Sequence, residues 1–188
     1  MDSTSPSLLE RVRNLGDEQA WRRFVDLYTP LLYEWTRRIG LQAGDAADLV
    51  QDVFTVLLEK LPTFQYDPQK SFRAWLKTVL LNLWRDRCRR QAVGPRPAGD
   101  AGLSGVADSA DPDFFDEAEY RKYIVNRALK LMQAEFQPAT WKAFWESEVA
   151  GRPVAEVAAE LGLTPNAVYL ARSRVLRRLR EELDGLLE

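Results

Sequence analysis

The sequence predicts an all-α fold in which two small helical domains are joined by a flexible acidic linker, and three observations lead to this prediction. Apolar residues recur at three- and four-residue spacing in several long segments, which is the period of an amphipathic helix. No segment alternates apolar and polar residues as a half-buried strand does. Residues 92–113 are rich in Gly, Pro, Ala, Ser and Asp and cannot offset their ordering entropy by burial. We therefore expect domains over residues 1–91 and 116–188 and a linker over residues 92–115.

The first expected helix lies in the N-terminal domain and begins after Asp17, whose side chain can cap it. Its apolar positions recur from Trp21 to Ile39 at helical spacing. Pro30 lies in the middle of this stretch and is expected to bend or break the helix, because proline removes a backbone donor.

Two more helices are expected in this domain. One runs from about Ala46 to Leu61, with an apolar inner stripe and a polar outer stripe; the outer residues are Asp48, Gln51, Asp52, Thr55 and Glu59. After the loop "PTFQYDPQK", Ser71 can cap a third helix that continues to about residue 90. Its outward face carries Thr78, Asn82 and Arg85, and it ends in "RDRCRR".

The C-terminal domain is expected to contain four helices around an aromatic core. The last two are separated only by Gly162, Leu163 and Thr164, and the final helix opens at Pro165, where the missing N–H costs nothing. The spacing fits a DNA-binding helix-turn-helix, which requires a small residue in the first helix, a glycine in the turn and an apolar residue in the second helix. These are Ala158, Gly162 and Val168. The same spacing also fits an ordinary helical hairpin with a solvated basic face.

The outward face of this last helix favours DNA binding over the hairpin interpretation. Asn166, Tyr169, Ser173 and Arg174 are residue types that reach base edges. Arg177, Arg178 and Arg180 follow them and are suited to phosphates. The third helix of the first domain, with its basic end, offers a second surface for DNA, although solvated arginines near a helix C-terminus are the alternative explanation.

The amino-acid composition excludes several kinds of functional site. The 188 residues include no histidine and one cysteine, Cys88, which excludes an internal disulfide, a Cys/His zinc cluster and catalysis by imidazole. No segment approaches the roughly 20 apolar residues of a membrane span, and the N-terminal residues lack the basic start and long apolar run that a signal peptide has. We therefore expect a cytoplasmic protein without membrane insertion, enzyme activity, catalytic residues, metal or cofactor.

The charges are sorted into blocks, which makes a nucleic-acid partner compatible with a net charge of −2. Residues 70–96 carry eight basic side chains against the single acid Asp86. Residues 97–119 carry seven acids and no Lys or Arg. Contacts with phosphates depend on the local potential more than on the total charge. The acidic linker is expected to lie along a positively charged channel of its partner and, in the free protein, to fold back on the basic helices.

Four stretches occur in an order and at a spacing that carry a family resemblance: "GDEQAWRRFVDLYTPLL", "DAADLVQDVFTVLLEKL", "SFRAWLKTVLLNLWRDRCRR" and "RPVAEVAAELGLTPNAVYLARSRVLRRLREEL". With them the chain resembles the extracytoplasmic-function class of bacterial sigma factors, which keep only the two core domains of the larger sigma factors. The resemblance implies a sigma factor that binds core RNA polymerase and directs promoter recognition, DNA melting and transcription initiation. It also implies external control, by an anti-sigma factor, a modifying enzyme or transcription of the gene.

The resemblance also implies roles for individual residues. Asp48, Gln51 and Asp52 match the positions at which the family binds the clamp helices of the largest polymerase subunit. The loop from Phe64 to Lys70 matches the segment that holds a flipped base, and Asn82 matches a contact to the minus-ten element. The residues expected at the minus-ten element are therefore Phe64, Tyr66, Lys70, Thr78, Asn82, Arg85 and Arg89. Packing beneath the loop is the alternative role of Phe64 and Tyr66.

At the minus-thirty-five element the expected residues are Thr164, Asn166, Ala167, Tyr169, Leu170, Ser173, Arg174, Arg177 and Arg178. This helix departs from the family pattern, since it has Asn166-Ala167 before the central valine and Tyr169-Leu170-Ala171 after it, and Arg172 occupies a usually apolar position. The minus-thirty-five sequence that this helix reads therefore does not follow from that of relatives.

Two other classes of function remain as alternatives. The chain could be a sigma-like interaction protein that binds polymerase or an anti-sigma partner without reading DNA, although such a protein has no need of two basic helices. An enzyme with Asp48 and Asp52 as metal ligands is the third possibility, but no phosphate-binding glycine loop or imidazole accompanies them.

Overall fold

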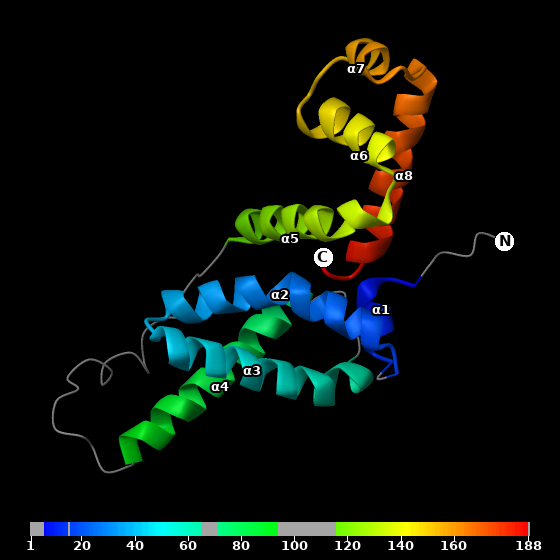
Figure 1. Ribbon diagram of the computed structural model, residues 1–188. Coiled ribbons are helices and arrows are strands. Elements are labelled where there is room, and N and C mark those ends of the chain that lie inside the picture. Colours follow the sequence, from blue (N-terminus) through cyan, green and yellow to red (C-terminus); the bar gives the residue numbers. More distant parts are fainter. Residues whose placement is uncertain (1–5, 15, 65–70, 94–115, 188) are drawn as a thin grey trace.

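The computed structural model describes residues 6–14, 16–64, 71–93 and 116–187, of which the side chains of Ala92 and Val93 are excepted. Every regular element in these segments is helical, which confirms the all-α prediction (Figure 1). The predicted linker lies almost entirely outside the described residues, as do Tyr66 and Lys70.

The chain begins with a short helix that the periodicity did not predict. Helix α1 spans Leu8–Val12 and is closed by a capping box, in which the Ser7 hydroxyl accepts from the Glu10 amide and the Glu10 carboxylate accepts from the Ser7 amide. Helix α2, Glu18–Arg38, begins at the predicted cap, where Asp17 accepts from the Ala20 amide at 2.8 Å. The hydrogen bond from the Arg11 side chain, and after it the one from the Ala20 amide, lower the pKa of Asp17.

Helix α2 runs through Pro30 without a break, so the expectation of a break is wrong. Proline cannot donate a hydrogen bond to the carbonyl four residues earlier, which is that of Asp26. In the structure this carbonyl accepts instead from Nε of Arg127, at 3.0 Å, and Arg127 belongs to a helix of the C-terminal half. A tertiary contact thus replaces the missing intrahelical bond.

Two helices complete the N-terminal half. Helix α3 spans Ala43–Lys60, three residues earlier at its start than predicted, and a single turn, η1, follows at Leu61–Thr63. Helix α4 spans Phe72–Val93, and the Ser71 hydroxyl accepts from the Ala74 amide at its start, as predicted. The apolar stripe of α3 is fully buried, and its members are Leu49, Val53 and Leu57.

The C-terminal half contains four α-helices with two short helical turns between them. Helix α5 spans Glu117–Met132 and is followed by η2, Gln133–Glu135; helix α6 spans Pro138–Phe144 and continues into a π-helical turn, η3, Trp145–Val149. Helices α7, Val154–Leu161, and α8, Pro165–Leu183, are the predicted final pair. Between them Gly162 has φ +64°, and the Thr164 hydroxyl accepts from the Ala167 amide.

The two halves share one hydrophobic core. Tyr120, Ile124 and Ala128 of α5, together with Leu183 and Leu186 at the C-terminal end, belong to the same buried cluster as the apolar residues of α1 to α4. Figure 1 shows α5 lying beside α2, with the end of α8 next to α1, while α6, α7 and the start of α8 project away from the N-terminal half. The turn between α7 and α8 is packed separately, around Val157, Ala158 and Val168.

Polar side chains join the halves at the centre of this core. Tyr120 Oη donates to the Leu186 carbonyl oxygen at 3.0 Å, so its hydrogen is used and Tyr28 Oη donates to Tyr120 Oη at 2.7 Å. Burial raises the pKa of both phenols. Both groups therefore stay neutral and form a hydrogen-bonded chain across the junction.

Two arginines and two glutamates also join the halves and alternate in a closed ring, which we call the Arg–Glu ring: Arg23, Glu135, Arg178 and Glu182. Arg23 lies 3.0 Å from Glu135 and 2.8 Å from Glu182, and Arg178 lies 3.1 Å from Glu135 and 2.7 Å from Glu182. The Glu182 side chain is 2% exposed. Only Arg23 comes from the N-terminal half, so it alone connects this ring to α2.

Candidate functional site

The predicted acidic stripe lies on the outer face of α3. Asp48, Gln51 and Asp52 are exposed, because α3 turns its apolar stripe inward at helical spacing. These three side chains line a hollow of about 350 Å³, and its other wall comes from Leu83, Arg87 and Arg90 of α4. The structure therefore adds a second helix to the surface that the sequence placed on α3 alone.

Arg87 joins the two walls of this hollow. Its Nη2 lies 2.7 Å from Oδ1 of Asp45 and 3.7 Å from Oδ2 of Asp48, and its Nη1 donates to the Asp45 carbonyl at 3.4 Å. The Arg87 side chain is 25% exposed. It thereby orients the start of α3 against the second half of α4 and partly neutralises one carboxylate of the stripe.

Sequence reasoning missed Leu83, Arg87 and Arg90 as members of this surface. A signal was present, since the three residues follow one another at four- and three-residue spacing and so share a face of α4. The basic run "RDRCRR" spans more than one face of α4, because successive residues of a helix point in different directions.

A different face of α4 carries the residues predicted for the minus-ten element. Thr78, Asn82, Arg85 and Arg89 are all exposed, as the periodicity predicted. The Thr78 hydroxyl donates to the Ala74 carbonyl, and Arg89 forms an ion pair with Asp86. Phe64 is half-buried, and its ring packs against Trp75 at 4.5 Å and Phe72 at 5.9 Å between centroids. Phe64 thus packs against the start of α4.

The N-terminal half of α8 presents a largely free surface. The predicted base-reading residues are exposed; they are Thr164, Asn166, Tyr169, Leu170, Ser173 and Arg174. Ala167 is half-buried beside the turn, and Val168 is fully buried beneath it. Arg172 pairs with Glu148 of η3 and lies 5.9 Å from the Tyr169 ring, so this unusual residue packs against its own domain.

The two arginines predicted for phosphates differ in their surroundings. The Arg177 side chain is 73% exposed, and its Nε lies 4.0 Å from Glu181. Arg178 belongs to the Arg–Glu ring and is 32% exposed. Burial acts to lower the pKa of Arg178, but Glu182 and Glu135 outweigh it and raise that pKa above its usual value. Arg178 thus stabilises the fold through its ion pairs with Glu135 and Glu182, whereas the exposed Arg177 is available to a partner.

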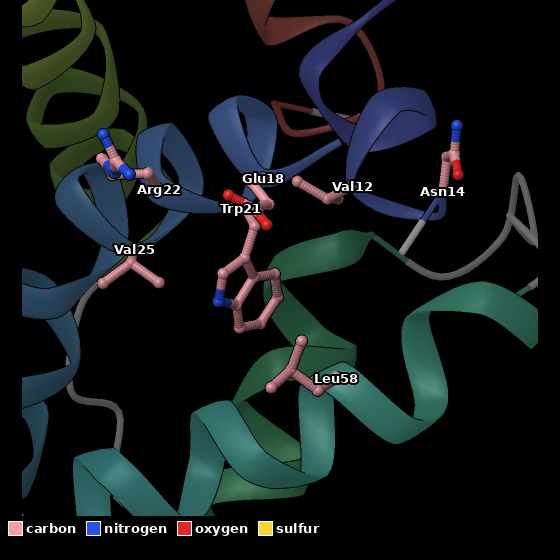
Figure 2. Close-up of a pocket in the computed structure, with 7 residues that line it drawn as sticks. All are labelled: Val12, Asn14, Glu18, Trp21, Arg22, Val25 and Leu58. Atoms are coloured by element: carbon pink, nitrogen blue, oxygen red, sulfur yellow. The ribbon is translucent and has the colours of Figure 1, made fainter. Parts of the chain in front are cut away.

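A second hollow, of about 440 Å³, lies between the start of α2 and the end of α3. Figure 2 shows the Trp21 ring pointing toward Leu58 across it, with Val25 on the same side as Trp21. The other lining residues are Val12, Asn14, Glu18 and Arg22. None of the residues expected at polymerase or DNA lies in this groove.

In the segments that the structure describes, no group of three or more His, Cys, Asp or Glu side chains is placed to hold a metal ion. None of the helices within those segments has the length and apolar character needed to cross a bilayer.

Comparison with known proteins finds relatives over nearly the whole chain. The family model described as Sigma-70 region 2 matches residues 24–93. The chain is 30% identical over 195 residues to the RNA polymerase sigma factor NccH of Alcaligenes xylosoxydans xylosoxydans, with 98% of this chain and 97% of that protein covered. It is 29% identical over 175 residues to the RNA polymerase sigma factor CnrH of Cupriavidus metallidurans, with 90% of each covered. A solved structure of CnrH in complex with the cytosolic domain of CnrY matches at 24% identity and a TM-score of 0.37, covering 92% of each chain.

Proposed function

Because the chain belongs to the extracytoplasmic-function class of RNA polymerase sigma factors, which act in transcription initiation as regulatory proteins and not as enzymes, we propose that it binds core RNA polymerase through the outer face of α3. The contact residues on α3 are Asp48, Gln51 and Asp52. In this proposal residues 1–91 contact polymerase and the minus-ten element, and residues 116–188 contact the minus-thirty-five element. The alternative of a sigma-like protein that does not read DNA is not favoured.

One observation carries the polymerase assignment. The three polar residues of α3 are exposed, and they share a hollow with α4, while the opposite stripe of the same helix is fully buried. A charged stripe serves the fold little when its residues face solvent, since exposed ion pairs contribute about 0–1 kcal/mol. Such a stripe does steer and orient a charged partner.

For DNA, the proposal assigns two separate helical faces. The minus-ten face is that of Asn82, Arg85 and Arg89 on α4, all exposed. The minus-thirty-five face is the N-terminal half of α8, where Asn166 and Arg174 are exposed and suited to base edges. Arg177 continues this face toward the DNA backbone.

The first test is reconstitution of the full chain with core RNA polymerase. Transcripts initiated on a genomic library should begin downstream of a shared promoter with two conserved blocks. Initiation no higher than with core polymerase alone would contradict the proposal.

A charge-reversal variant tests the α3 contact. Asp48→Lys with Asp52→Lys should weaken binding to core polymerase by at least about tenfold, which is about 1.4 kcal/mol. Binding can be measured by competition with the labelled parent. The control, Glu156→Lys with Asp184→Lys, makes the same change of net charge at two exposed residues in the C-terminal half. Equal affinities of the two folded variants would remove α3 from the interface.

A further inference from the structure

The arginines near the end of α4 point to two different surfaces. Arg85 and Arg89 continue the exposed face of Asn82. Arg87 and Arg90 follow Leu83 and line the hollow opposite α3. A helix advances about 100° per residue, so the adjacent Arg89 and Arg90 lie on different faces although their chemistry is identical.

Arg90 differs from Arg87 in its ion pairs with the described residues. Arg87 is held by Asp45 and Asp48. Arg90 is exposed and forms no ion pair with another described residue, and the same holds for Asp52 across the hollow. A cation and a carboxylate therefore face one hollow, and each is free to meet a charge from outside.

The hollow is poorly suited to DNA. A phosphate that approached Arg90 would also come near Asp48 and Asp52, which line the same hollow, and like charges repel one another. A protein segment that carries both positive and negative side chains meets no such penalty, since a basic side chain can pair with Asp52 and an acidic side chain with Arg90. Leu83 adds apolar contact within the same hollow.

We propose that Arg90 is a contact to core RNA polymerase and not to promoter DNA, while Arg87 fixes α3 relative to α4 through Asp45 and Asp48. This inference rests on the proposed function of the α3 face and extends that face to a second helix. The partner segment carries a basic side chain that pairs with Asp52 and an acidic side chain that pairs with Arg90. Helix α4 then contacts polymerase on one side and DNA on another, so polymerase binding orients the DNA-binding face directly.

Matched variants at the two neighbouring arginines test this assignment. Arg90→Glu should weaken binding to core polymerase by at least about tenfold, whereas Arg89→Glu should leave it within about twofold of the parent. Holoenzyme assembled at saturating core should show the reverse for promoter binding. Arg89→Glu should weaken it and lower the salt slope by about one unit, while Arg90→Glu keeps the slope of the parent. Arg13→Glu, an exposed arginine far from both faces in sequence, controls for net charge.

The outcomes separate this inference from the proposed function. If Arg90→Glu binds core polymerase as the parent does while Asp48→Lys with Asp52→Lys does not, the inference is overturned and the α3 contact stands. If neither binds more weakly, the α3 contact itself is wrong. If Arg90→Glu lowers promoter affinity and the salt slope as Arg89→Glu does, Arg90 belongs to the DNA face. Arg90→Gln, checked by circular dichroism, repeats each measurement with a smaller change.

Discussion

At the scale of single residues, the neighbours Arg177 and Arg178 are expected to behave differently. Arg177→Ala should weaken binding to every duplex and lower the salt slope by about one unit, because its exposed guanidinium is free to contact a phosphate. Arg178→Ala should lower the free energy of unfolding by about 1–3 kcal/mol, because the buried Glu182 keeps only Arg23 as a partner.

Two measurements on the same proteins check this difference. Salt titrations with cognate and scrambled minus-thirty-five duplexes report on phosphate contacts, and urea denaturation reports on stability. A salt slope that falls equally in both variants, with equal stabilities, would show that Arg178 leaves its ring to contact DNA.

At the scale of elements, the turn between α7 and α8 depends on the backbone of one glycine. Gly162 has φ +64°, and a Cβ added there would meet no atom within 4 Å. Gly162→Ala should therefore cost about 1–2 kcal/mol of unfolding free energy through backbone conformation alone. Gly162→Asn should cost less, because asparagine adopts this conformation more readily.

Gly44 is the matched control for this prediction. It lies in the first turn of α3, where a Cβ would also meet no atom within 4 Å and no positive φ is required. Gly44→Ala should raise the free energy of unfolding by about 0.4–1 kcal/mol, because alanine restricts the unfolded chain more than glycine does. Urea denaturation of both variants checks this, and effects of the same sign would contradict the backbone explanation.

At the scale of the whole molecule, the Arg–Glu ring is expected to hold the two halves together. Arg23→Ala removes the only member that α2 contributes and leaves Glu182 buried with Arg178 alone. The loss of one partner from a buried ion pair costs about 3–5 kcal/mol, and the remaining arginine reduces that cost. The free chain should therefore lose stability and show a larger radius of gyration in small-angle X-ray scattering.

The exposed neighbour Arg22 provides the control, since Arg22→Ala removes the same charge from the same helix without touching the ring. It should leave both the radius of gyration and the urea midpoint close to those of the parent. A parent-like radius and midpoint for Arg23→Ala would mean that apolar packing of α5 and the end of α8 holds the halves without the ring.

The sequence by itself determined the helices other than α1, three of their caps and which faces they bury. Asp17, Ser71 and Thr164 cap helices where predicted, and Leu49, Val53 and Leu57 are buried as their spacing requires. These features depend on hydrogen bonds and side-chain spacing within a few residues, so a linear pattern records them. Helix α1 was missed although its capping box at Ser7 and Glu10 is readable, because one short turn shows no periodicity.

Only the tertiary structure decided which charged side chains remain available to partners. Arg178 and Arg23 share the same two glutamates in the Arg–Glu ring, whose members lie up to 159 residues apart in sequence. Arg127 supplies the hydrogen bond to the Asp26 carbonyl that Pro30 cannot make. Arg89 and Arg90 are adjacent in sequence but face different surroundings, since α3 covers one side of α4. A guanidinium pairs with whichever carboxylate folding brings within about 4 Å, and no local pattern specifies that neighbour.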